Sequence, residues 1–199
     1  MEAVIKEMPK HWLEERRKSD ASCRDEMWSG VLHMAPMPNL FHQELGSELF
    51  GLLKQRWAKP LGGKVYQEIN LTTPEDEQDW TKNYRVPDLV LLSAERLEFR
   101  RVEYVAGPPL VCIEIKSPND ESYEKLPFYA GLGVPEVWSI DRDTKKPDML
   151  ILKEGEYRSL TADQEGWLRS DAVGVRMRDR DAKLLMEFDG DAEPAVIPD

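Results

Sequence analysis

Hydrophobic and polar positions recur along this chain in patterns that predict both strands and helices. Residues 64–71 alternate with the period of a strand. Residues 86–92 and 110–116 each carry a run of apolar side chains bounded by Pro or Gly, which is typical of buried strands. Leucines recur at helical spacing within residues 40–57, so this segment is expected to form an amphipathic helix.

Further patterns predict how these elements are connected. Residues 27–34 are expected to form a hairpin, because Ser29 and Gly30 provide a turn signal. A helix is expected around residues 123–132, with Pro127 tolerated only in its first turn. Strand, helix and strand over residues 110–140 then form a right-handed parallel crossover. The fold class is α/β or α+β, with a central mixed sheet flanked by helices.

The length of 199 residues favours one main domain with extensions. We place this domain at residues 25–186, after an N-terminal extension over residues 1–24. Within it, residues 149–152 and 157–160 predict a late hairpin. The last residues, 187–199, are acidic and contain proline, and they are expected to be a frayed tail.

Two of the buried strands carry charged residues that a buried strand normally excludes. Glu114 and Lys116 are two residues apart and therefore share one strand face. Cys112 and Leu110 lie on that same face, which indicates that the face is covered. If Asp88 lies beside Glu114, two carboxylates and one ammonium group converge. The alternatives without a catalytic role are a turn position for Asp88 and a surface ion pair between Glu114 and Lys116.

A hard cation beside a phosphodiester would suit this arrangement. Mg²⁺ prefers carboxylate and water oxygens, and it both activates water and offsets phosphate charge. Asp88 and Glu114 would be its ligands, joined by the carbonyl group of Ile115, and Mn²⁺ could replace it. Lys116 would hold the attacking water or stabilise the phosphoryl oxygens.

Other charged residues are weaker candidates for the site. Glu44 or Glu48 on the first helix would complete the site, although such a pair opposite a leucine stripe is more often a solvated face. His42 is expected to be a helix-start residue with a local hydrogen bond, and a role in the site is the less favoured alternative. For the basic group, phosphate contact and a solvated hairpin are equally good interpretations; its members are Arg96, Arg100 and Arg101.

The composition of the chain argues against some classes of function and indicates where the protein is located. Acidic residues outnumber basic ones by 38 to 27, giving a formal net charge of −11, which argues against a protein that coats nucleic acid. Cys23 and Cys112 give no disulfide framework or zinc spacing, so a reducing cytoplasm is expected. No stretch of 18 apolar residues and no signal-peptide core occur, so no membrane partner is expected.

An ordered set of motifs spans roughly residues 25–178. Its segments are Gly30-Val31-Leu32, His42-Gln43, Tyr84-Arg85-Val86-Pro87-Asp88, Glu114-Ile115-Lys116-Ser117-Pro118, Glu124-Lys125 and Tyr129 to Trp138. Glu-x-Lys alone is a weak signal, but the whole series is much more specific. On the basis of this series of motifs, the chain resembles the Uma-type restriction endonuclease family of the PD-(D/E)XK nuclease superfamily.

The resemblance implies a restriction-endonuclease-like core with Asp88 and Glu114 as metal ligands. It also implies Lys116 as the catalytic lysine. Many members of this family instead supply the lysine from the following helix, where this chain has Lys125. Pro127 departs from the usual pattern of that helix, so Lys116 is the first choice and Lys125 the second.

Two functions remain open at this point. The first is a metal-dependent DNA endonuclease, expected to act as a homodimer because two strands must be cut. The second is a catalytically idle interaction or assembly module on the same fold, since a fold alone does not determine function. The acidic balance supports the second, and the complete set of site residues supports the first.

Overall fold

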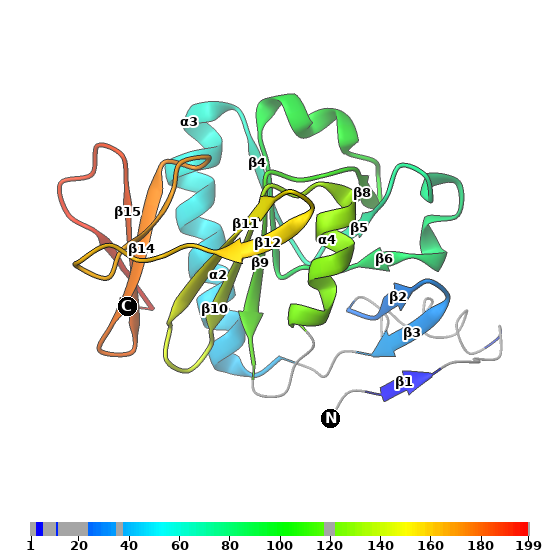
Figure 1. The fold of residues 1–199 in the computed structure, drawn as a ribbon, viewed down its shortest axis with the longest axis horizontal. Helices are drawn as coiled ribbons and strands as arrows, with labels where there is room; N and C mark the ends of the chain where they lie inside the picture. The colour runs from blue at the N-terminus through cyan, green and yellow to red at the C-terminus, as the bar shows by residue number, and fades with distance from the viewer. Residues whose placement is uncertain (1–2, 6–10, 12–23, 35–37, 118–121, 199) are drawn as a thin grey trace.

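The apolar segments form three β-sheets in the computed structural model, which describes residues 3–5, 11, 24–34, 38–117 and 122–198. Figure 1 shows the central sheet between a helix and the C-terminal strands on one side and the N-terminal strands on the other. In spatial order, the central sheet consists of β12 (Glu156–Ser159), β11 (Pro147–Lys153), β10 (Glu136–Asp141), β9 (Val111–Lys116), β7 (Leu89–Leu92) and β4 (Lys64–Gln67).

The central sheet is mixed, as the sequence predicted. Strands β9 and β10 are parallel, and the helix between them completes the expected crossover. The neighbouring pairs are antiparallel, including the late hairpin formed by β11 and β12. Cys112 in β9 is a buried free thiol, so this side chain is part of the apolar interior.

One face of the central sheet packs against helix α2 (Leu40–Leu53). Leu45, Leu49 and Leu53 of this helix are fully buried. Asn39 caps it, because its side chain accepts a hydrogen bond from the His42 N–H. The helix continues through the π-helical turn η1 (Lys54–Ala58) into α3 (Lys59–Leu61).

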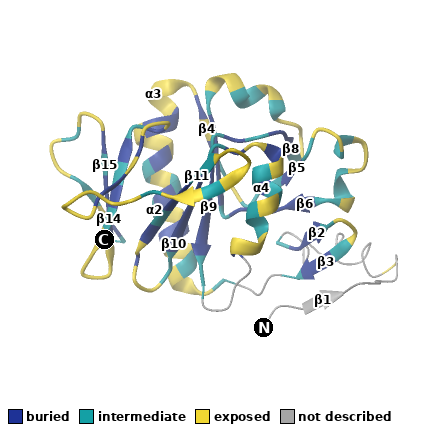
Figure 2. Ribbon diagram, viewed as in Figure 1, coloured by how far each residue is buried: buried dark blue, intermediate teal, exposed yellow. Residues whose placement is uncertain are grey.

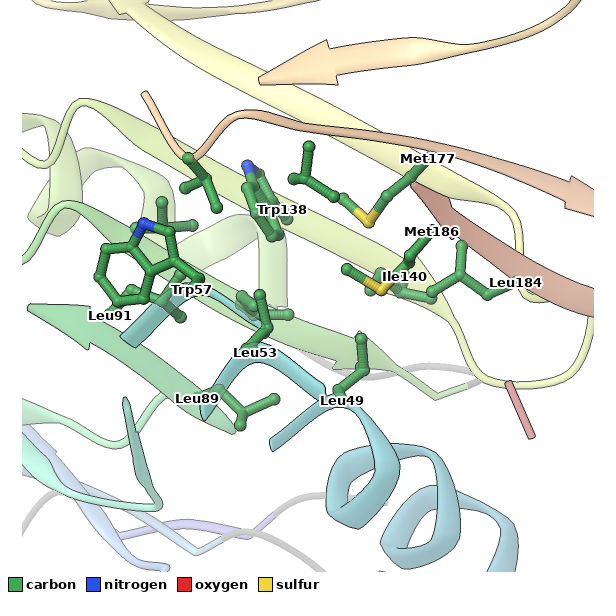
Figure 3. Close-up of a cluster of buried hydrophobic side chains, with 14 of the residues drawn as sticks. Leu49, Leu53, Trp57, Leu89, Leu91, Trp138, Ile140, Met177, Leu184 and Met186 are labelled. Atoms are coloured by element: carbon green, nitrogen blue, oxygen red, sulfur yellow. The ribbon is translucent and has the colours of Figure 1, made fainter. Parts of the chain in front are cut away.

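The C-terminal sheet closes the same core beyond α2. Its strands, in spatial order, are β13 (Leu168–Ser170), β14 (Val175–Arg180), β15 (Lys183–Phe188) and β16 (Ala195–Ile197). Figure 3 shows Trp138 of β10 among leucines of α2 and methionines of this sheet. Ile197 is buried and β16 pairs with β15, so the segment that was expected to fray is part of the sheet.

The opposite face of the central sheet packs against α4 (Leu126–Leu132), which follows the 3-10 turn η4 (Ser122–Lys125). Pro127 lies in the first turn of α4, the position at which the sequence allowed it. Tyr129 and Leu132 are buried against Val90 and Cys112. Figure 2 shows the buried inner strands beneath a more exposed outer surface of α4.

The N-terminal sheet lies next to α4 in Figure 1. Its strands, in spatial order, are β1 (Ala3–Ile5), β3 (Val31–Met34), β2 (Glu26–Trp28), β6 (Tyr84–Arg85), β5 (Asn70–Thr72) and β8 (Tyr104–Ala106). Strands β2 and β3 form the predicted hairpin. Most of the predicted extension over residues 1–24 lies outside the described residues.

Arg85 joins this sheet to α4. Its guanidinium group lies 4.4 Å from the ring centroid of Trp28 and 4.3 Å from that of Phe128. Burial lowers the pKa of Arg85 to about 10, and its side chain also donates hydrogen bonds to backbone carbonyls, including that of Met27 at 3.1 Å. The stacking therefore fixes β2 against the helix that follows β9.

The single strand predicted for residues 64–71 is interrupted. At Glu68 the backbone takes a φ of 50°, which an extended strand excludes. Strand β4 therefore joins the central sheet and β5 the N-terminal sheet. Two 3-10 turns complete the described elements, η2 (Glu77–Lys82) and η3 (Ala94–Phe99).

None of the helices in the described part of the chain has the length and apolar character needed to cross a membrane. The cytoplasmic location expected from cysteine usage stays a prediction.

Candidate active site

Asp88 and Glu114 meet where β7 begins and β9 ends. The antiparallel register pairs Leu89 with Ile113, so Asp88 lies beside Glu114 at the next position. The Asp88 Oδ2 atom accepts a hydrogen bond of 2.6 Å from the Ile115 N–H. The structure therefore brings together the two carboxylates that the sequence proposed as metal ligands.

The first turn of α2 supplies His42 to the same point. Its Nε2 atom lies 3.2 Å from Asp88 Oδ1. Gly46, one turn later, allows the helix to approach the strand, since a Cβ atom there would lie 3.3 Å from Ile115 Cδ1. His42 thus makes the local hydrogen bond expected at a helix start, through its N–H, and also contacts the candidate ligand Asp88 through its ring.

Glu114 points toward α4 and the turn that precedes it. Its Oε1 atom accepts a 2.6 Å hydrogen bond from the Tyr129 hydroxyl group, and its Oε2 atom lies 3.2 Å from Lys125 Nζ. The turn η4 brings Lys125 back over β9, and Pro127 does not prevent this contact. Of the two candidate lysines, Lys125 is therefore the one that contacts Glu114.

Lys125 has a second carboxylate partner. Its Nζ atom lies 2.8 Å from Oε1 of Glu26 on β2. Sequence reasoning missed Glu26, because a single acidic residue in a hairpin strand carries no signal of a partner about a hundred positions away. Tyr129 is a second residue with no such signal: it is buried in the core, and its hydroxyl group donates a hydrogen bond to Glu114.

The pKa values of Glu114, Lys125 and Tyr129 are all raised, but the cause differs from one group to the next. Burial raises the pKa of Glu114 to about 8, although Lys125 opposes the change. Burial alone would lower the pKa of Lys125, but Glu114 and Glu26 together raise it well above its usual value. Burial and the neighbouring Glu114 also raise the pKa of Tyr129. Lys125 is therefore held as a cation.

Lys116 lies apart from this cluster. Its Nζ atom is 4.8 Å from the ring centroid of Tyr123. The side chain lines a cavity of about 450 Å³ together with Asp141, Lys146 and Asp148. Tyr123 belongs to η4, so both candidate lysines lie near this turn, but Lys116 contacts the Tyr123 ring whereas Lys125 contacts Glu114.

Asp88 and Ile115 line a second, smaller cavity of about 240 Å³ on the α2 side. His42 and Gln43 of α2 contribute to its wall. Arg24 and Glu68, which form an ion pair, also line it. Asp88 is therefore the candidate ligand that a small molecule or ion reaches from solvent.

The remaining predicted residues lie away from this point. Glu44 is exposed on α2 and is not part of the wall of the Asp88 cavity. The three arginines lie in or just after η3, which follows β7 at the end of the strand opposite Asp88. Arg96 bonds the Pro108 carbonyl group at 2.8 Å, and Arg101 pairs with Glu77. The structure does not bring them to the site.

The donor set at the strand ends fits one class of metal. Within the described part of the chain, no group of three or more His, Cys, Asp or Glu side chains is placed to hold an ion. Mg²⁺ does not require such a group, because it keeps several waters and binds through one or two carboxylates. Asp88, Glu114 and the Ile115 carbonyl group offer that set, and Asp88 is near enough for its charge to raise the pKa of Glu114.

Comparisons with known proteins agree with this architecture. A family model described as "Uma2: Putative restriction endonuclease" matches residues 13–178. The crystal structure of "a putative nuclease belonging to DUF820 from Anabaena variabilis ATCC 29413" superposes with a TM-score of 0.59 at 17% sequence identity. The match covers 75% of this chain and 82% of that chain, and it shows a shared fold. Among curated proteins, none matches the sequence.

Proposed function

The chain belongs to the Uma2 family, described as "Putative restriction endonuclease", and on this basis we propose that it is a metal-dependent DNA endonuclease that hydrolyses phosphodiester bonds. The observation that carries the proposal is the contact between Lys125 and Glu114, with Asp88 beside them at the ends of adjacent strands. A carboxylate pair with a fixed cation suits a reaction in which negative charge builds on a phosphate.

Asp88, Glu114 and the carbonyl group of Ile115 would hold Mg²⁺, and Mn²⁺ could take its place. When bound, the ion would activate water and offset the charge that develops on the phosphate. The Ile115 N–H fixes one oxygen of Asp88, and Tyr129 fixes one oxygen of Glu114. These two hydrogen bonds orient the carboxylates.

Lys125 acts as a cation in this proposal. Its raised pKa excludes a role as a general base, because the neutral amine is not populated near neutral pH. It stabilises the charge on the scissile phosphate and on the water that attacks it. Lys116, which lines the neighbouring cavity, is the second candidate for contact with the DNA backbone.

The test is a cleavage assay on supercoiled and single-stranded DNA with Mg²⁺ or Mn²⁺. Wild type is compared with Glu114→Ala, Lys125→Ala and Lys116→Ala, and Glu154→Ala in the exposed β11–β12 turn is the control. We expect metal-dependent cutting that is lost in the first two variants and kept in the control. Equal cutting by all proteins would indicate a contaminant and defeat the proposal.

A catalytically idle assembly module is the second candidate function. It is favoured by the fact that all four oxygens of Asp88 and Glu114 already have protein partners. An idle module predicts no DNA cleavage and no change in melting temperature with Mg²⁺. Sedimentation of the purified protein also tests the homodimer, which stays a prediction.

A further inference from the structure

Glu26 occupies an unusual position for a carboxylate in a hairpin strand. Its side chain is 7% exposed, and three donors surround it. Oε1 lies 2.8 Å from Lys125 Nζ and 2.9 Å from the Val86 N–H, and Oε2 lies 2.6 Å from Trp28 Nε1. One carboxylate thus contacts both the lysine of the candidate site and the chain two residues before Asp88.

The charges around Lys125 explain why a second carboxylate is useful. Lys125 lies closer to Glu26, at 2.8 Å, than to Glu114, at 3.2 Å. If Glu114 were the only partner, binding of a cation by Glu114 would leave the buried ammonium group without a counter-charge. With Glu26 present, Lys125 keeps one carboxylate partner while Glu114 coordinates an ion.

We propose that Glu26 is a positioning residue, the resident counter-ion that holds Lys125 in place and fixes the Val86–Asp88 segment beside it. The proposal rests on the proposed nuclease function, which it deepens by adding a residue from a separate sheet. Glu26 does not touch the reacting atoms, and it acts through Lys125 and through the backbone before Asp88.

A purely structural role explains the position less well. Replacing a buried ion pair by apolar residues is often neutral or stabilising. The stability of the fold is therefore a weak explanation for a buried ion pair at this position. A purely structural role would account for the hydrogen bond with Trp28. It would not account for the contacts with Lys125 and with the Val86 N–H, which connect Glu26 to the candidate site.

The chain contains a matched control for Glu26. Glu136 is also buried in a strand, and its Oε2 atom likewise accepts a hydrogen bond from the indole nitrogen two residues later, in Trp138. The register pairs Glu136 with Val111, at the end of β9 opposite Lys116. It therefore reproduces the Glu-x-Trp contact away from the lysine.

The experiment compares the full chain with Glu26→Gln, Glu26→Asp and Glu136→Gln. We expect Glu26→Gln to lower kcat for DNA cleavage about 10- to 100-fold with KM within about twofold, as for other partners of site residues. Glu26→Asp should be intermediate, because it keeps the charge. Glu136→Gln should cut like wild type. Equal kcat losses in Glu26→Gln and Glu136→Gln would overturn the proposal.

A second measurement separates this proposal from the nuclease function. The ¹⁵N signal of the Lys125 ammonium group, assigned by its loss in Lys125→Met, is recorded without metal or DNA. We expect slow proton exchange in wild type and in Glu136→Gln, and fast exchange in Glu26→Gln. If wild type cuts no DNA, the nuclease proposal fails, and this signal still decides the role of Glu26. Should Glu26→Gln fail to fold, Glu26→Asp provides the same comparison, and an unchanged signal there contradicts the proposal.

Discussion

At the end of strand β9, the charged groups near α4 and those near α2 differ in how far they are exposed to solvent. On the α4 side, Glu114 is 4% exposed, its partners Glu26 and Tyr129 are buried with it, and the side chain of Lys125 is 13% exposed. On the α2 side, Asp88 is 18% exposed and lines a cavity open to solvent. The closed side fixes a cation in a constant place, and the open side leaves a carboxylate where ions and water can exchange.

This difference assigns separate tasks to residues that the sequence treated as one group. Charges removed from water interact more strongly and cost more when they lose a partner. Charges near water can change their ligands at little cost. Variants on the closed side should therefore affect folding as well as activity, whereas variants on the open side should affect ligand binding alone.

The largest expected effect is on the closed side. Lys125→Met should lower the free energy of unfolding by about 3–5 kcal/mol, because it leaves Glu26 and Glu114 buried without a cation. Lys116→Met, the same change at the lysine that lies over the Tyr123 ring, should cost less than about 1 kcal/mol. Urea unfolding of both variants measures the difference. Equal costs would show that the two lysines share one environment.

The next effect concerns the open side. Saturating Mg²⁺, at about 100 times its dissociation constant, should stabilise wild type by about 2.7 kcal/mol. Asp88→Asn should lose this gain while keeping most of the stability of the metal-free protein. Glu44→Gln, on the exposed part of α2, is the control and should keep the gain. Thermal melts with and without Mg²⁺ give the result, and a full gain in Asp88→Asn would remove Asp88 from the site.

A smaller effect follows from the raised pKa of Glu114. Between pH 5 and about 8 the folded protein keeps a proton on Glu114 that the unfolded chain releases. The free energy of unfolding should therefore fall as pH rises through this window, by about 1 kcal/mol per pH unit. Glu114→Gln should remove this contribution. Urea unfolding in a chelator from pH 5.5 to 8.5 tests it, and parallel curves for the two proteins would contradict it.

The smallest effect is expected from the basic group near η3. The triple variant Arg96→Gln, Arg100→Gln and Arg101→Gln should cut DNA at the wild-type rate, because these residues follow β7 at its other end. Initial rates at several salt concentrations provide the measurement. A large loss, steepest at low salt, would show that the DNA path reaches this end of the sheet.

The central architecture could be predicted from local patterns. The leucine spacing of α2 and the apolar run of β9 each depend on a short stretch of chain. The parallel crossover follows from the order of these elements. The break at Glu68 could not be predicted, because it reflects the competition of two sheets for neighbouring strands. The pairing of β16 was likewise hidden behind an acidic, proline-containing composition.

The candidate site was predictable where it depends on one strand and its neighbour. Asp88 beside Glu114 followed from two short patterns. The choice between Lys116 and Lys125 depends on how η4 turns back over β9, which alternation along a strand does not contain. Glu26 reaches the site through the packing of a separate sheet. Such contacts arise from tertiary structure, and a single sequence gives little sign of them.

The stacking of Arg85 between Trp28 and Phe128 limits how this protein could be recombined with its relatives. A chimera that exchanged residues 24–34 alone would bring a foreign hairpin to a guanidinium group that is fitted to two specific rings. Lysine in place of Arg85 would not restore the fit, because it lacks a planar group. The hairpin, Arg85 and the first turn of α4 therefore have to be exchanged together in a chimera. They span about a hundred residues of the chain.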